Sequence, residues 1–230
     1  MSSDMNTTRD GRTGNDLSMP TMTTTVDLGI PDTISYEHPS LYLTADRRDF
    51  ILRHIQTEPM ATIYASIEAT AASDFDDIDL DDWDAKAHGN NGEIASANAF
   101  LAWLNDDETA ANRAINAMAL LNDDWDKHEG WGINIRMQSP LIHYTAAWDL
   151  MKATPYFSEA EAQLAEEKLT NITTQFYDKY VLDEFTRNLS LLPTQNNHGI
   201  RTAAAIGFVA LAFPNHPNAP AWMDWATSEL

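Results

Sequence analysis

The chain of 230 residues contains no cysteine. Disulfide bonds and thiolate metal sites are therefore excluded, and cysteine usage gives no indication of the redox compartment. Basic residues are also scarce, because 14 Lys and Arg stand against 35 Asp and Glu, a formal net charge of −21. A nucleic-acid-binding surface must be cationic to release counterions, and an anionic membrane attracts the same kind of surface. We therefore expect neither partner, and a polyanionic ligand would need a local site that opposes the overall field.

Long apolar runs are absent as well. A membrane-spanning helix needs roughly 18 or more consecutive apolar residues, and the sequence offers no such stretch, so no membrane insertion is expected. Residues 1–36 are polar and interrupted by glycine and proline, which predicts a flexible N-terminal arm without the apolar centre of a signal peptide. The protein is expected either to be cytoplasmic or to lack, in this chain, an export signal.

Apolar residues at helical spacing predict an all-α domain over residues 37–230 with about eight helices and no strand. Short connections favour antiparallel helix pairs. Helices are expected from Thr44, after Pro59, over 93–104, from Asp106, over 139–153, from a capping box at Ser158, over 202–213 and from Ala219.

Seven of residues 73–84 are aspartate. Among them, Asp77, Asp79 and Asp81 match the first three ligand positions of a calcium loop. Asp82 stands where that loop requires glycine, and the closing acidic residue is missing too. A solvated acidic loop is the favoured interpretation, calcium is the alternative, and no cofactor is otherwise expected.

Residues 194–201, Thr-Gln-Asn-Asn-His-Gly-Ile-Arg, lead into an apolar helix. A helix N-terminus offers free N–H groups and the positive end of the dipole, which suits a carboxylate. The amides of Asn196 and Asn197 add neutral donors, His198 can donate or move a proton, and Arg201 adds a fixed positive charge. The stretch therefore predicts a carboxylate-binding site, although an Asn-Asn-His turn is also an ordinary helix cap.

These donors suit β-elimination from a uronic acid. Groups clustered on the carboxylate stabilise the enediolate that forms as the C5 proton leaves. A base then takes that proton, and an acid protonates the leaving glycosidic oxygen. The reaction needs no metal or organic cofactor.

The Asn-Asn-His-Gly turn entering a small-residue helix resembles the heparinase II/III-like and alginate lyase group of polysaccharide lyases. Two further stretches are similar to the same group. One is His-Pro-Ser-Leu-Tyr-Leu-Thr at residues 38–44, before the first helix, and the other is residues 141–151 with Trp-Asp-Leu at 148–150. The resemblance extends over residues 38–213.

The resemblance implies an incomplete (α/α) toroid, a fold that in this group is usually followed by a β-sandwich. It also implies a carbon–oxygen lyase that acts on an alginate- or heparin-like glycan in the periplasm or outside the cell. By the family pattern, Asn197 and His198 neutralise the substrate carboxylate, and His198 also serves as base for one epimer. The family's catalytic tyrosine lies on a later helix pair, but no tyrosine follows His198 in this sequence. We therefore expect an N-terminal fragment with little or no activity.

Trp131, Asn134 and Arg136 are candidates for lining the substrate cleft, with an aromatic face for a sugar ring and a cation for its carboxylate. The alternative is that Trp131 packs in the core or a loop. His143 and Tyr144 have core spacing and are expected to be structural. Two other functions stay open: an (α/α)-barrel glycoside hydrolase, which needs two suitably separated carboxylates, and a noncatalytic helical carbohydrate-binding or scaffold protein.

Overall fold

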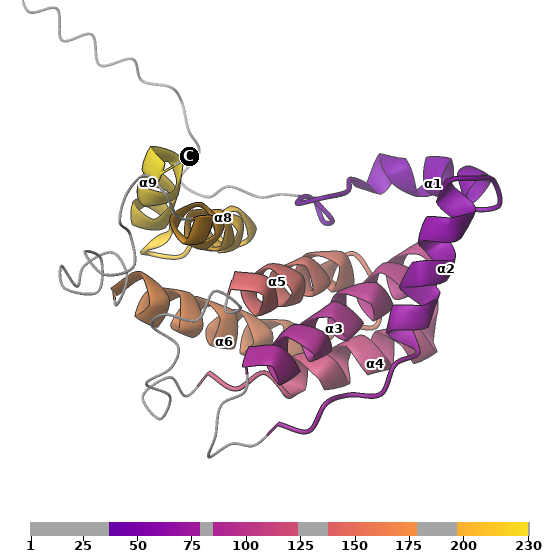
Figure 1. Ribbon diagram of the computed structural model, residues 1–230, viewed down its shortest axis with the longest axis horizontal. Coiled ribbons are helices and arrows are strands. Elements are labelled where there is room, and N and C mark those ends of the chain that lie inside the picture. The colour runs from indigo at the N-terminus through magenta and orange to yellow at the C-terminus, as the bar shows by residue number, and fades with distance from the viewer. Residues whose placement is uncertain (1–36, 79–84, 124–137, 179–196, 230) are drawn as a thin grey trace, which may run out of the picture. The chain divides into compact units, whose positions relative to one another are not determined.

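The computed structural model describes residues 37–78, 85–123, 138–178 and 197–229, and the regular elements among them are all helical (Figure 1). For Ala85 and residues 197–199 only the backbone is described. The predicted all-α class is confirmed for these residues, and the predicted arm, 1–36, lies outside them. The elements are η1 (Ala45–Arg47), α1 (Arg48–His54), α2 (Met60–Ala71), α3 (Ala85–Asn105), α4 (Glu108–Ala119), α5 (Gln138–Lys152), α6 (Glu159–Tyr177), α8 (Asn197–Ala212) and α9 (Ala219–Glu229).

Polar caps fix where the predicted helices begin. The Asp107 side chain accepts hydrogen bonds from the backbone N–H groups of Thr109 and Ala110 and so caps α4. Ser158 and Glu161 form the predicted capping box at the start of α6, each side chain accepting from the other residue's backbone N–H. These caps satisfy N–H groups that have no acceptor within their own helix.

Two helices begin earlier than the sequence pattern predicted. Helix α3 begins at Ala85 rather than at residue 93, and α8 begins at Asn197 rather than at residue 202. In both cases the added residues include glycine and asparagine, whose intrinsic helix propensity is low. Packing accounts for the α3 extension, because a Cβ on Gly92 would lie 3.2 Å from the Cβ of His143 on α5. Close contact between the two helices therefore stabilises a turn that propensity alone disfavours.

Successive helices pack as antiparallel pairs. Helix α3 packs on α4, α5 on α6 and α8 on α9, while α2 packs on α3. Asn98 Nδ2 donates to the carbonyl of Ala71 at the end of α2, and Asn105 Nδ2, at the end of α3, donates to the hydroxyl of Tyr64 near the start of α2. The two helices therefore run in opposite directions. These contacts agree with the predicted helix pairing.

The first helix of each pair runs in the same direction. On α5 and α8, Gln138 bonds Thr202 at 2.9 Å near the helix starts, and the rings of Trp148 and Phe213 lie 4.6 Å apart near their ends. Helix α3 runs in the same direction as α5. Ser96 of α3 contacts His143 of α5, and Asp106, just after α3, bonds Tyr156, a few residues after α5. Helices α3, α5 and α8 therefore all begin at one end of the helical layer (Figure 1).

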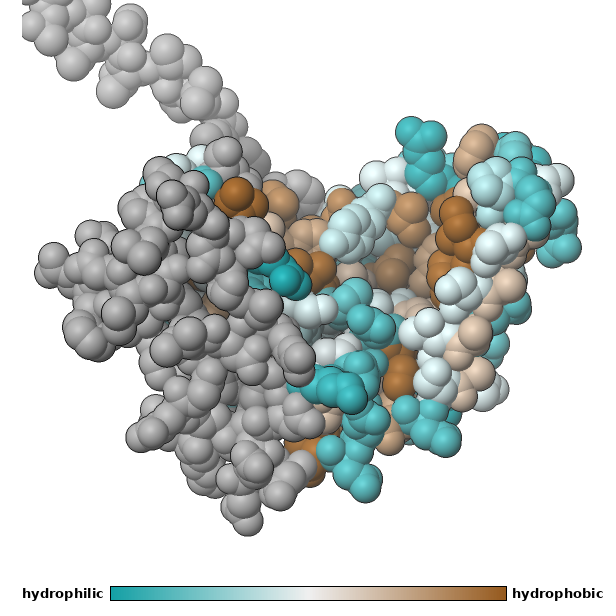
Figure 2. Space-filling model, viewed as in Figure 1, coloured by the Kyte–Doolittle hydropathy of each residue, from teal (hydrophilic) through white to brown (hydrophobic). Residues whose placement is uncertain are grey.

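The core lies between the helices and alternates small and large side chains. Ala95, Ala99 and Ala102 of α3 are buried and leave room for large partners on neighbouring helices. The fully buried large side chains include Tyr144, Phe176, Leu104, Met151, Ile206 and Trp222. Apolar residues also remain exposed on the face shown in Figure 2. Among the described residues, the exposed large apolar side chains include Ile63 of α2. Each fully buried large side chain contributes about 1.5–3 kcal/mol, which compensates for the weak helix propensity of the glycine and asparagine residues.

Candidate functional site

The Asn-His pair lies in the first turn of α8. Asn197 and His198 are its first two residues, so they lie inside the helix and not in a turn before it. The first four N–H groups of a helix have no intrahelical acceptor, and a polar residue costs little there. Arg201, in the next turn, is exposed. Backbone donors, a histidine position and a cation position therefore share the first two turns of one helix.

A buried polar contact lies one turn further along α8. The hydroxyl of Thr202 is buried and accepts a hydrogen bond from Nε2 of Gln138, the first residue of α5. Gln138 is 2% exposed, and its Oε1 has no hydrogen-bond partner among the described residues. This contact ties the start of α5 to the start of α8. Sequence reasoning missed Gln138, because it lies one residue before the helix predicted there.

The remaining predicted site residues are not placed. Asn196, Trp131, Asn134 and Arg136 lie outside the described residues, as do Asp79 and Asp81 of the calcium alternative. Asp77 is described and exposed. Within the described ranges, no group of three or more metal-ligating side chains occurs.

The carboxylate of Asp149 organises the segment before the first helix. Asp149 is 2% exposed, on α5, and its oxygens accept from the backbone N–H groups of Ser40 and Leu41, both at 2.9 Å. The Ser40 hydroxyl donates at 3.2 Å, and Nδ1 of His38 lies 2.6 Å from the same carboxylate. The edge of the His38 ring also packs on Trp148, with centroids 5.2 Å apart. The two stretches at 38–44 and 148–150, considered separately in the sequence, therefore form one contact.

A second polar cluster lies between α2, α3 and α5. It lines a shallow cavity of about 320 Å³ that is wide open to solvent, and its polar side chains include Glu93 and Ser96 of α3 and His143 of α5. His143 was expected to be structural, but its ring is about one-third exposed and faces this cavity. Burial lowers the pKa of His143, and the nearby Glu93 carboxylate partly opposes that shift. Its neighbour Tyr144 is fully buried as expected, and burial raises the pKa of its hydroxyl far above the usual range.

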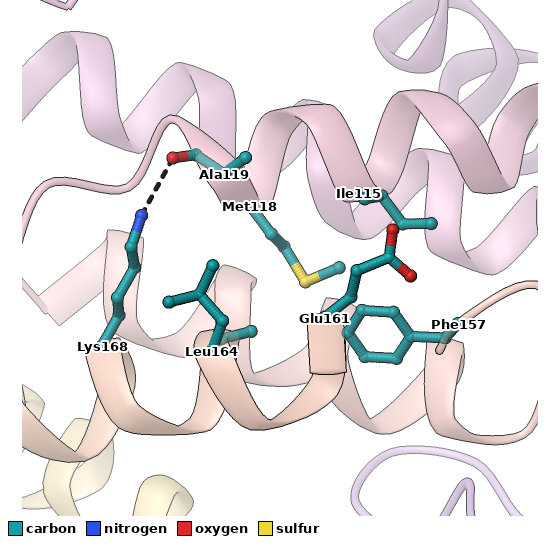
Figure 3. Close-up of a pocket in the computed structure, with 8 residues that line it drawn as sticks. Ile115, Met118, Ala119, Phe157, Glu161, Leu164 and Lys168 are labelled. Carbon is teal, nitrogen blue, oxygen red and sulfur yellow. Dashed lines mark hydrogen bonds between the residues drawn. The ribbon is translucent and has the colours of Figure 1, made fainter. Parts of the chain in front are cut away.

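A separate cavity between α4 and α6 is small and mostly apolar (Figure 3). Its volume is about 40 Å³, and its walls include Met118, Leu164 and Phe157. The ammonium group of Lys168 at one end donates to the carbonyls of Ala119 and Leu121, so it caps the end of α4. Burial lowers the pKa of Lys168. We assign this cavity a packing role, because its cation is already bonded and its volume is that of a water-sized void.

No protein-family model matches the chain, and no curated protein matches it. None of the described helices is long and apolar enough to cross a membrane. The functional proposal therefore depends on the residues and their geometry, together with the resemblance described above.

Proposed function

We propose that the protein is a polysaccharide lyase, or part of one, that cleaves a uronic-acid-containing glycan by β-elimination. The observation that carries the proposal is the position of Asn197 and His198 in the first turn of α8, at the end where α3 and α5 also begin. Free backbone N–H groups and the helix dipole favour a carboxylate at that point.

In this mechanism the substrate carboxylate binds at the start of α8. Asn197 donates a neutral hydrogen bond, and Arg201 supplies a positive charge close to the carboxylate. Charge builds up on the carboxylate oxygens as the C5 proton leaves, so donors placed there stabilise the transition state more than the ground state. His198 donates to the carboxylate or accepts the C5 proton, since its ordinary pKa is about 6.5.

The contact made by Asp149 supports the resemblance on which the proposal rests. Residues 38–41 and Asp149 are about 110 positions apart in sequence. Even so, the backbone N–H groups of Ser40 and Leu41, the Ser40 hydroxyl and the His38 ring all contact the buried Asp149 carboxylate. Two sequence stretches that resemble the same family thus form one structural unit. A chance likeness of either stretch would not require that contact.

The helix arrangement also supports the proposal. Successive antiparallel pairs with parallel first helices are the repeating unit from which an (α/α) toroid is built. We propose that α3–α9 form part of such a toroid and that the glycan lies across the end where α3, α5 and α8 begin. Trp131, Asn134, Arg136 and Asn196 are then proposed to contact the sugar from the connections at that end.

The activity assay follows the ultraviolet absorbance of unsaturated uronate ends on alginate, heparan, chondroitin and ulvan. No tyrosine follows His198 in the sequence, so the 230-residue chain is compared with a form extended to include any sequence encoded downstream. We expect His198→Ala in the active form to lower turnover by more than about a hundredfold, the lower end for loss of acid–base catalysis. The matched control is His54→Ala on α1. Unchanged turnover in His198→Ala would contradict the assigned role, and absence of product from every glycan would reject the lyase proposal.

A further inference from the structure

The cavity between α2, α3 and α5 is the size of a small-ligand site. Its volume of about 320 Å³ falls in the usual range for such pockets, roughly 300–1,000 Å³. Its lining combines apolar side chains, Ile67 of α2 and Phe100 of α3, with polar ones that include Glu93 and His143. A pocket with apolar side chains and a few polar groups fits a ligand that has an apolar body and a charged or polar head.

The hydrogen bonds of Ser96 favour one tautomer of His143. The Ser96 hydroxyl donates to the backbone carbonyl of Glu93 at 3.0 Å. Nδ1 of His143 lies 3.4 Å from the same hydroxyl oxygen, an arrangement that favours the tautomer whose proton is on Nδ1. In the neutral ring, Nε2 then carries a lone pair and no proton. Burial favours this neutral form, because it lowers the pKa of His143.

With this tautomer, Nε2 of His143 and the carboxylate of Glu93 are two neighbouring hydrogen-bond acceptors in the lining of the cavity. Nε2 of His143 lies 3.9 Å from Oε1 of Glu93, too far for a direct hydrogen bond. A charged N–H donor bonds at about 2.7–2.9 Å, so one ammonium nitrogen can reach both acceptors. A tetrahedral zinc ion, with ligand distances of about 2.0–2.2 Å, would hold its ligands about 3.3–3.6 Å apart. The observed separation therefore fits a bridging ammonium group better than a metal ion.

We propose that this cavity binds a small primary amine, with its ammonium group between Nε2 of His143 and the carboxylate of Glu93 and its apolar body against Phe100. The aromatic ring adds attraction for a nearby cation. The net charge of −21 raises the local concentration of cations at the surface. This site is independent of the proposed lyase chemistry at the start of α8.

The same side chains do not form a hydrolytic triad. Ser96 lies within α3, where backbone N–H groups are bonded inside the helix and cannot stabilise an oxyanion. Its proton goes to a carbonyl oxygen and not to the histidine. The cluster therefore binds a donor without activating the serine.

Gly92 sets the geometry of the site. It lies against α5, and a Cβ there would be 3.2 Å from the Cβ of His143 and 3.3 Å from the ring of Tyr144. Because glycine allows this approach, the His143 ring reaches the polar side chains of α3. A larger residue at position 92 would push α5 away and widen the gap between the two acceptors.

The test titrates the 230-residue protein with benzylamine and maps the affected amides by heteronuclear NMR. We expect saturable shifts confined to α2, α3 and α5, and binding of benzyl alcohol weaker by at least about tenfold. Benzyltrimethylammonium carries the charge without an N–H donor and should also bind more weakly. Equal binding of either control ligand, or shifts that map elsewhere, would overturn the proposal.

Two variants separate the site from the general acidic field. Glu93→Gln removes the carboxylate that lines the cavity, and Glu68→Gln removes one from α2 that does not line it. We expect Glu93→Gln to weaken benzylamine binding by about fivefold, the effect of a partly exposed ion pair, and Glu68→Gln to leave it unchanged. Identical affinities for the two variants would refute the assignment. Titrations with glucosamine and with Nα-acetyllysine methylamide then distinguish an amino sugar from a lysine side chain as the natural carrier of the amine.

Discussion

At the residue scale, two buried or half-buried polar groups hold distant segments together. The Asp149 carboxylate accepts hydrogen bonds from backbone and side-chain groups of residues 38–41, and His143 of α5 contacts Ser96 of α3. A buried charge is tolerated only when hydrogen bonds replace the water it loses. Asp149, at 2% exposed, should therefore be far less replaceable than an exposed aspartate.

Asp149→Asn should be strongly destabilising. The amide keeps one acceptor but turns an NH₂ group toward the N–H donors of Ser40 and Leu41, which leaves buried donors unpaired. We expect a loss of about 2–4 kcal/mol in the free energy of unfolding, measured by urea denaturation. Asp224→Asn on the exposed side of α9 is the control and should change stability little. Equal effects of the two substitutions would show that the Asp149 contact is not formed in solution.

His143 should make the fold acid-sensitive. Its pKa in the folded protein is lowered by burial, so the unfolded chain binds the proton more readily as the pH falls. The stability lost through this group therefore begins below its unfolded pKa of about 6.5 and continues to its folded pKa. Unfolding free energies of wild type and His143→Gln, compared at neutral and mildly acidic pH, should show the smaller acid loss in the variant. A parallel pH dependence of the two proteins would exclude this contribution.

At the scale of single elements, the helix caps can be predicted from the sequence, whereas the effect of a glycine within a helix cannot. The capping box at Ser158 forms as predicted, and Asp107, next to the predicted start at Asp106, caps α4. Both signals lie in residues close to the helix start. Glycines at 89, 92 and 207 lie inside helices that they would weaken if isolated. What differs among them is the neighbouring helix, which sequence spacing does not reveal.

Gly89→Ala and Gly207→Ala should change stability in opposite directions. A Cβ at position 89 meets nothing within 4 Å, whereas at position 207 it would lie 3.0 Å from the Cβ of Ala226 on α9. We expect Gly89→Ala to stabilise the fold by roughly 0.5–1 kcal/mol through lower chain entropy. Gly207→Ala should destabilise it by about 1–3 kcal/mol, because the two helices must move apart. Thermal unfolding of the two variants checks both signs. A stabilising Gly207→Ala would contradict the close packing of α8 on α9, and a destabilising Gly89→Ala would contradict the open space at position 89.

At the scale of the whole molecule, the excess of acidic residues opposes compaction. Thirty-five acidic residues against 14 basic ones leave a net charge of −21, and like charges repel one another across the surface. This field also opposes a uronate polymer, so the proposed carboxylate site depends on local donors at the start of α8. A bound amine, by contrast, gains from the overall field.

Added salt should stabilise the protein. Raising sodium chloride to about 1 M shortens the Debye length to about 3 Å and screens the repulsion between surface carboxylates. The midpoint of thermal unfolding should therefore rise between low and high salt. Potassium chloride serves as a control for ion-specific effects and should give the same rise. A falling midpoint would show that attractive ion pairs outweigh the net repulsion.

The sequence by itself determined the helical class and most helix boundaries. Caps at Asp107 and Ser158, together with the apolar spacing of α4 to α6, depend on residues a few positions apart, so local physics is sufficient. It also supplied the Asn-His pair, whose position in the first turn of α8 the structure describes and whose chemistry stays a prediction.

Only the tertiary structure decided which distant groups meet. Three features join segments that are distant in the sequence: the contact between His38 and Asp149, the bond between Gln138 and Thr202, and the cavity lined by Glu93 and His143. These contacts depend on how closely the helices approach, and that distance is set by small residues such as Gly92, whose role appears only beside its neighbour. Side-chain spacing within one helix contains no information about that distance, which is why His143 was expected to be structural and instead faces a cavity.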